Sequence, residues 1–445
     1  MKRRISLLLV IVMLFAILPH TAAADGGSPS VLRVGVSSLQ EIFSPFFFQA
    51  GYDNDAVALT QVNLLGADRG GAPVTRGIEG EHRSFGGADY VYYGIADCDV
   101  TQNSDGTVDY LFRLRDDVLF ADGEPLTVKD VLFSIYVLCD PAYDGGTTFY
   151  NLPIEGLEEY RQGSADSISG VTRIDDRSFR IHMTEFDLTA LYLLCIPVAP
   201  MHYYGDASQY NGVDNFGFPK GDLSMIRAKN SEPMGAGPYV FESREDGVLT
   251  LSKNERYYRG EPRTDFIQFV EDASSAEKIG DGTVDLTVDS AFSLSTVSYL
   301  KYFNGGELSG DVITTVTTDF SGYGYIGINA NCVKVGNDPG SDASRALRKA
   351  YATVFAAYRE ETVGSYYGDR AAVIEYPISS SSWAAPRAGD KGYETAFSKD
   401  AEGRAIYTEG MDHEARRAAA LEAAVGSSGP RASPGTGPRL PTFPP

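Results

Sequence analysis

The sequence predicts an α/β protein built from more than one domain. Segments in which apolar and polar residues alternate, as in β-strands, follow one another along the chain between segments with the apolar spacing of helices. The chain has 445 residues, of which 43% are hydrophobic. A chain of this length exceeds what a single hydrophobic core usually serves. Two or three domains are therefore expected.

The N-terminus predicts export. Residues 2–4 are Lys-Arg-Arg, residues 5–18 are apolar except for Ser6, and residues 22–24 are three alanines that suit signal-peptide cleavage. The apolar run is shorter than the roughly 20 residues of a membrane span, which makes a retained anchor helix the weaker alternative. The first cysteine is Cys98, so no lipid anchor is expected near the cleavage site. We expect cleavage after Ala24 and a soluble protein outside the cytoplasm.

The net charge and the spacing of the cysteines argue against several classes of function. The formal net charge of −22 repels nucleic acids and anionic lipid surfaces, so no nucleic-acid partner is expected. Cys98, Cys139, Cys195 and Cys332 lack the C-x-x-C spacing of metal or redox sites, and three of the four lie in apolar contexts. Buried free thiols are favoured over disulfides.

The first predicted strand ends where a ligand would be expected. Apolar and other residues alternate over residues 32–36, and Ser37, Ser38 and the apolar loop 42–48 follow. Strand ends that open onto small hydroxyl side chains are common places for a ligand cleft.

The remaining elements follow in order. Thr127 to Asp130 has the sequence of a capping box and precedes an apolar helix over residues 131–138. A long helix is predicted from Asp342, as its N-cap, to Val363, and a last helix around residues 416–424. Further strands are predicted at residues 90–94, 110–114, 178–183, 238–241 and 248–252, the last two as a hairpin, and at 267–271, 284–289 and 312–317 as strands of a later domain.

The last twenty residues differ in composition from the rest. Residues 426–445 hold four Gly, six Pro and two Arg but no acidic residue. Such a segment buries too little apolar surface to order itself. An altered reading frame or an assembly artefact explains the abrupt loss of acidic residues better than a natural disordered tail does.

The usual enzyme motifs are missing from the sequence. It contains no G-x-S-x-G, H-E-x-x-H or Walker-type loop, and its five histidines are far apart. GYGYIG at 322–327 matches a dinucleotide loop only formally, because it lies in a strand-like run that opens no helix. Residues 103–109 carry oxygen ligands without the spacing of a calcium loop. We therefore expect no catalytic residues, metal or cofactor; a secreted hydrolase is a weak alternative, since no carboxylate pair stands out.

Several blocks resemble one known family. Residues 105–135, DGTVDYLFRLRDDVLFADGEPLTVKDVLFSI, are similar to the most recognisable block of the family 5 extracellular solute-binding proteins of peptide, dipeptide and nickel ABC transporters. Further similar blocks follow the family's order at residues 32–47, 235–269, 325–332, 345–363 and 377–383.

The resemblance implies a fold and a function. It implies a two-lobed, class II type periplasmic-binding-protein-like fold with an extra subdomain inserted in the first lobe, and a monomer that encloses a small peptide between its lobes. The bound solute stabilises the closed form, which an ABC-transporter permease in the membrane recognises. The implied domains are a signal peptide at 1–24, a first lobe at 25–65 and 180–264, an inserted subdomain at 66–179, a second lobe at 265–425 and a disordered tail at 426–445.

The resemblance also implies candidate ligand contacts and one departure. The implied contacts are Ser37, Ser38, Phe43, Gly235, Gly237 and Trp383. Each has a structural alternative: Ser38 as a turn cap, Phe43 in a core, the glycines for backbone geometry, and Trp383 packed under a loop. The family's acidic residue for a peptide amino group would come after the helix that ends near Ala424, so the second lobe is expected to be incomplete. A non-functional remnant of such a receptor is the main alternative.

Overall fold

The computed structural model describes residues 29–288, 294–316, 322–400, 402–408 and 410–427. The predicted signal peptide and residues 428–445 of the predicted tail lie outside these residues. Within the described part, no helix combines the length and the apolar character needed to cross a membrane.

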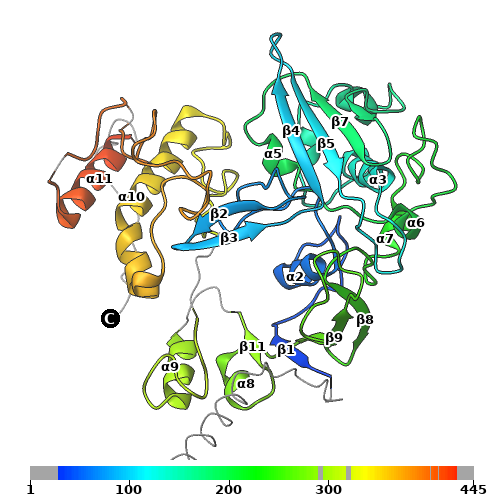
Figure 1. Cartoon of the computed structure of the whole chain (residues 1–445). Helices are drawn as coiled ribbons and strands as arrows, with labels where there is room; N and C mark the ends of the chain where they lie inside the picture. The colour runs from blue at the N-terminus through cyan, green and yellow to red at the C-terminus, as the bar shows by residue number, and fades with distance from the viewer. Residues whose placement is uncertain (1–28, 289–293, 317–321, 401, 409, 428–445) are drawn as a thin grey trace, which may run out of the picture.

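A five-stranded sheet forms the base of the molecule in Figure 1. The strand order is β11-β1-β10-β9-β8, and β1 lies parallel to both of its neighbours. Helix α2 (Gly51–Thr60) packs against this sheet, and the two share a core with the loop that follows β1. The strands are β1 (Val31–Gly35), β8 (Tyr239–Glu245), β9 (Val248–Lys253), β10 (Phe266–Val270) and β11 (Leu286–Thr287).

The structure corrects the placement of two predicted strands. Residues 267–271 and 284–289 were expected in a later domain, yet β10 and β11 flank β1 in the first sheet. Ile267 and Phe269 alternate along β10 and are buried in the same core as α2. The apolar pattern identifies a strand, but the choice of its partner depends on residues more than two hundred positions away. Of residues 284–288, the described part of the second segment, only Leu286 and Thr287 form a strand.

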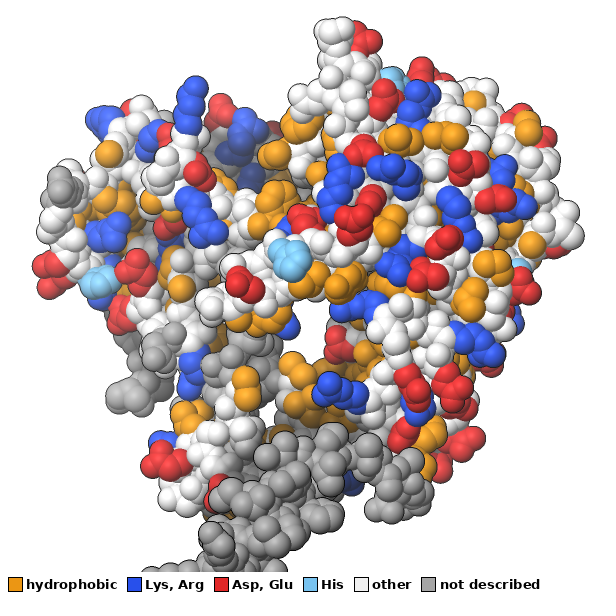
Figure 2. Space-filling model, in the orientation of Figure 1, with side chains coloured by type: hydrophobic (Ala, Val, Ile, Leu, Met, Phe, Trp, Pro, Cys, Tyr) orange, Lys and Arg blue, Asp and Glu red, His pale blue; other side chains and the backbone are white. Residues whose placement is uncertain are grey.

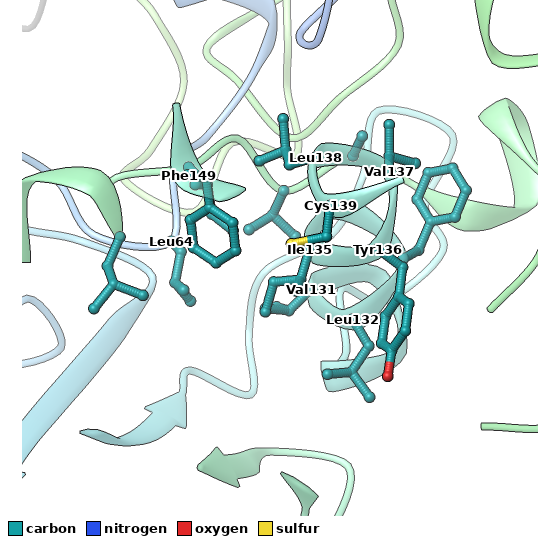
Figure 3. Packing of buried hydrophobic residues seen from close by; sticks show 14 of the residues in the cluster. Leu64, Val131, Leu132, Ile135, Tyr136, Val137, Leu138, Cys139 and Phe149 are labelled. Carbon is teal, nitrogen blue, oxygen red and sulfur yellow. The ribbon is translucent and has the colours of Figure 1, made fainter. Parts of the chain in front are cut away.

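A second sheet, with the antiparallel order β4-β5-β7-β6, carries the main core. Helix α3 (Val128–Cys139) lies against it with every residue buried except Lys129. Figure 3 shows its side chains packed with Leu64 and Phe149. The strands are β4 (Ala96–Gln102), β5 (Val108–Leu114), β6 (Val171–Arg173) and β7 (Ser178–Met183).

The predicted capping box of α3 is confirmed. The Thr127 hydroxyl accepts a hydrogen bond from the Lys129 amide at 3.2 Å, and the Asp130 carboxylate accepts one from the Thr127 amide at 2.9 Å. The other oxygen of Asp130 accepts from the Met201 amide at 3.0 Å. This one side chain therefore starts the helix and fixes the buried segment that enters α6.

Short elements connect and cover the two sheets. The β2–β3 hairpin stands apart from both sheets, at the centre of Figure 1. These elements are β2 (Glu81–Phe85), β3 (Ala88–Tyr92), η1 (Phe149–Asn151), α4 (Leu157–Arg161), α5 (Ala190–Leu193), α6 (Met201–Tyr204) and α7 (Ser224–Arg227).

Beyond β10, the larger regular elements of the described chain are helices. The 26-residue α10 packs against α11, and α8 lies beside α9 (Figure 1). Ser341, and not the predicted Asp342, caps α10, because its hydroxyl accepts from the Ser344 amide at 3.2 Å. The helices are α8 (Ala276–Gly280), α9 (Leu294–Phe303), α10 (Asp342–Tyr367), η2 (Gly368–Arg370) and α11 (His413–Ser427).

The strand predicted at residues 312–317 is wrong over its described residues, 312–316. Val312 and Val316 are 56% and 84% exposed. A strand needs a hydrogen-bonded neighbour as well as an alternating pattern, and no described segment pairs with these residues.

Candidate functional site

The loop after β1 lies at the carboxyl ends of parallel strands. The Val36 amide donates to the Val270 carbonyl at 2.9 Å, and Val36 in turn accepts from the Ala273 amide at 3.1 Å. Ser37 and Ser38, the next residues, are exposed. In Figure 2 the molecule is hollowed between the β2–β3 hairpin and the first sheet. The predicted serines thus lie at the edge of the sheet where the sequence pattern places a ligand.

Phe43, the third predicted contact in this loop, is fully buried. It packs in the core of the first sheet with Val36, Leu39 and Ala56. Phe43 is therefore a core residue, which was the structural alternative to a ligand contact. Its burial anchors the segment that carries Ser37 and Ser38.

Gly235 and Gly237 lie against the end of α2. The Gly237 amide donates to the Thr60 carbonyl at 3.0 Å, and the Gly235 carbonyl accepts from the Ala121 amide at 2.9 Å. A Cβ atom on Gly237 would lie 2.5 Å from the carbonyl oxygen of Leu59, closer than real Cβ contacts. Both glycines thus serve a close backbone approach between α2 and the chain that enters β8.

Trp383 lies apart from the other five predicted contacts, beside the loop at Gly70. Its backbone amide donates to the Gly70 carbonyl at 3.0 Å, and its ring lies 3.7 Å from the position of a Cβ on Gly71. The side chain is 44% exposed. Trp383 thus connects the chain after α10 to the loop that precedes the β2–β3 hairpin, while part of its ring stays available. The six predicted contacts therefore fall into three groups: the loop after β1, the end of α2, and the loop at Gly70.

Sequence reasoning missed a set of charged residues behind the loop after β1. The Glu271 carboxylate accepts from the Leu39 amide at 2.6 Å, and the Asp53 carboxylate accepts from the Gln40 amide at 3.1 Å. Arg244 forms an ion pair with Glu271 and lies 3.4 Å from a carboxylate oxygen of Glu41. No sequence signal pointed to this set, because Glu271 ended a strand that was expected in a later domain and that the structure pairs with β1.

Asp53 is the most buried member of this set. Its side chain has no exposed surface, and burial raises the pKa of its carboxyl group. The second carboxylate oxygen, Oδ2, has no hydrogen-bond partner among the described residues. A buried carboxylate held mainly by loop amides is well suited to fix the backbone of that loop.

An open cavity of about 520 Å³ lies at the opposite edge of the first sheet. It is lined by residues at the amino ends of β1 and β10, such as Pro29 and Phe266. The Lys253 ammonium beside it already contacts Asp265 at 2.8 Å and also pairs with Glu261. We therefore do not assign this cavity to a ligand. Across the described ranges, no group of three or more His, Cys, Asp or Glu side chains is arranged to hold a metal ion.

The four cysteines are free thiols. Cys98 and Cys139 are buried, Cys195 is partly buried and Cys332 is exposed. Burial raises the pKa of the Cys98 thiol to about 12 and that of Cys195 to about 11, so both are protonated and unreactive at neutral pH. The four cysteines are thus free, as predicted, but the predicted burial is complete only for Cys98 and Cys139 and is wrong for Cys332.

Comparison with known proteins gives a family match. The model of the family "Bacterial extracellular solute-binding proteins, family 5 Middle" matches residues 91–430. Di/tripeptide-binding protein 2 of Pseudomonas aeruginosa is 29% identical over 257 residues, which cover 55% of this chain and 42% of that protein. Oligopeptide-binding protein OppA of Lactococcus lactis is 27% identical over 240 residues, 52% of this chain and 36% of that protein. Each of these matches spans less than half the length of the relative.

Solved structures agree in fold. The chain is similar to the oligopeptide-binding protein AppA from Bacillus subtilis in complex with a nonapeptide, with a TM-score of 0.56 and 18% identity, over 83% of this chain and 62% of that chain. It is also similar to OppA of Burkholderia pseudomallei, with a TM-score of 0.56 and 15% identity, over 90% of this chain and 67% of that chain. The predicted α/β, two-lobed fold class is therefore confirmed.

Proposed function

Since this chain belongs to the bacterial extracellular solute-binding proteins of family 5, we propose that it is an extracytoplasmic receptor that binds a short peptide and delivers it to an ABC-transporter permease. The observation that carries this proposal is the family match, which extends over residues 91–430. The relatives named above are peptide-binding proteins, and this favours a peptide over nickel or another solute.

Features of the described residues support a peptide ligand. Ser37 and Ser38 present two exposed hydroxyl groups at the carboxyl ends of β1 and β10, where they are free to hydrogen-bond a peptide backbone. Trp383 presents a partly exposed aromatic face. The net charge of −22 favours a zwitterionic or cationic peptide over an organic anion, although the charge inside a pocket can oppose the net charge.

We assign different roles to the six candidate residues. Ser37, Ser38 and Trp383 are proposed as direct contacts, since each has exposed surface. Phe43, Gly235 and Gly237 are proposed as supports, since their surroundings are core or backbone. The receptor is proposed to act as an exported monomer without catalytic activity.

Thermal-shift and calorimetric screening tests the proposal. We expect alanine peptides of two to five residues to raise the melting temperature according to RT ln(1 + [L]/Kd), while maltose and citrate leave it unchanged. The double substitution Ser37→Ala and Ser38→Ala removes two hydroxyl contacts and should weaken peptide binding by roughly tenfold.

The matched control is Ser104→Ala, which replaces another exposed serine, at the tip of the β4–β5 hairpin, and should bind peptide like the wild type. Stabilisation by maltose or citrate and not by peptides would contradict the proposed function. Unchanged affinity in the double variant would remove the two serines from the site.

A further inference from the structure

We propose that Glu271 and Asp53 are positioning residues, which hold the backbone of residues 39–41 so that Ser37 and Ser38 face the ligand, and which thereby set the affinity for it. This inference rests on the proposed function for its ligand. The hold on the loop is a property of the unliganded chain and can be measured without any ligand.

Two carboxylates from different elements bind consecutive amides of one loop. Glu271 directly follows β10 and accepts from Leu39 at 2.6 Å, while Asp53 lies in the first turn of α2 and accepts from Gln40 at 3.1 Å. Hydrogen bonds between a charged carboxylate and a backbone amide are about twice as strong as neutral ones. The loop is thus fixed from the sheet on one side and from the helix on the other.

The Glu271 carboxylate is itself held in place. Its second oxygen pairs with the Arg244 guanidinium, which reaches it from β8. Both side chains are mostly buried, with 19% and 17% of their surface exposed. Arg244 also lies 3.4 Å from Glu41, so the same guanidinium bridges the end of β10 to the loop.

The backbone is strained in the segments that follow β1 and β10. Glu41 has a φ of 60° and Asp272 a φ of 54°, although neither is glycine. Such residues in the left-handed region persist only where the surroundings determine the conformation, and they cluster at ligand sites. The carboxylate contacts at Leu39 and Gln40 lie directly before the first of these strained residues and supply that constraint.

The other end of the segment is anchored independently. Phe46 and Phe47 are buried in the core of the second sheet, and the Tyr143 hydroxyl donates to the Phe46 carbonyl at 3.0 Å. The carboxylates therefore act on the backbone of residues 39–41, which lies before these anchors and whose Leu39 side chain packs in the core of the first sheet. Loss of Glu271 should disturb residues 39–41 without releasing the segment as a whole.

Amide hydrogen exchange and peptide binding, measured on the full chain, test the inference. Glu271→Ala should speed exchange at Leu39 and Gln40 and weaken binding of alanine peptides by roughly tenfold. Glu271→Gln keeps an oxygen that can accept from the Leu39 amide, so it should restore most of both properties. Arg244→Met keeps the volume but loses the ion pair, and should give a smaller effect in the same direction if Glu271→Ala does not fold.

The matched control is Glu261→Ala, which removes an ion pair with Lys253 at the opposite edge of the same sheet. It should leave exchange at Leu39 and peptide affinity unchanged. Unaltered exchange at Leu39 and Gln40 in Glu271→Ala overturns the inference, as does faster exchange with unchanged affinity. If the wild type binds none of the peptides, the proposed function fails, while the exchange rates still decide whether the carboxylates hold the loop.

Discussion

Asp265 shows how one side chain can join the segment that enters β1 to the middle of the first sheet. Its carboxylate contacts the Lys253 ammonium at 2.8 Å and accepts from the amide and the hydroxyl of Ser30, at 2.8 and 2.9 Å. These contacts, with Lys253 as the largest cause, lower the pKa of Asp265 to about 2. The residue thus favours the ionised state far more strongly in the folded protein than in the unfolded chain.

This shift predicts a pH dependence of stability with a defined sign. A depressed folded-state pKa means that the stabilising contribution is present above the unfolded pKa of about 3.9 and is lost as pH falls toward 2. Asp265→Asn removes this group, so the stability difference between wild type and variant should shrink between pH 5 and pH 3. Denaturant unfolding at several pH values measures it, and a difference that stays constant or grows on acidification would contradict the assignment.

At the scale of elements, the junction between α2 and β8 requires a residue without a side chain at position 237. A Cβ on Gly237 would meet three backbone groups at the end of α2, including the Leu59 oxygen at 2.5 Å and the Gln61 nitrogen at 2.7 Å. Backbone atoms cannot rotate away as a side chain can, so the helix and the strand would have to separate. This would also stretch the hydrogen bond from the Gly237 amide to Thr60.

Gly237→Ala should therefore lower the free energy of unfolding by about 2–3 kcal/mol, the range of core overpacking. Gly364→Ala is the matched control, since no described atom outside its own helix lies near a Cβ at that position in α10. It should raise stability by roughly 0.5–1 kcal/mol, because alanine favours the helix. Denaturant titration of both variants measures these changes; equal effects would show that the close approach is unimportant.

The elements that the sequence predicted well are those defined by local rules. The capping box at Thr127, the β8–β9 hairpin and strand β7 all follow from patterns within about a dozen residues. The partner of β10 could not be predicted in the same way, because its pairing with β1 joins distant segments. The roles of Glu271 and Asp53 were hidden for the same reason, since the amides they bind become neighbours only in the folded chain.

At the scale of the whole molecule, burial is uneven. Among the described residues, the two large cores lie within residues 36–269, whereas the third contains only Ala276, Leu300 and Ile313 as buried members. In the described residues beyond 322, the buried apolar side chains are few, and three of the four are alanines: Ala385, Ile406, Ala420 and Ala424. Because apolar burial is the main source of stability, these regions should differ in their resistance to opening.

Helices α3 and α10 make this contrast testable. Helix α3 buries eleven side chains, while the longer α10 buries only Ser344 and Thr353, and its Tyr351 and Phe355 are 48% and 43% exposed. Helix length adds little, since most helical stability in proteins comes from packing of an apolar face. We expect the amides of α10 to exchange through a low-energy local opening, and those of α3 only through global unfolding.

Hydrogen exchange followed by mass spectrometry at increasing sub-denaturing urea concentrations separates the two behaviours. The exchange rate of α3 should rise steeply with urea, because global unfolding exposes much surface, while that of α10 should be faster in water and respond weakly. Equal protection and equal urea dependence in both helices would show that the chain unfolds as one cooperative unit. The packing around α10 would then contribute far more to stability than its few buried side chains indicate.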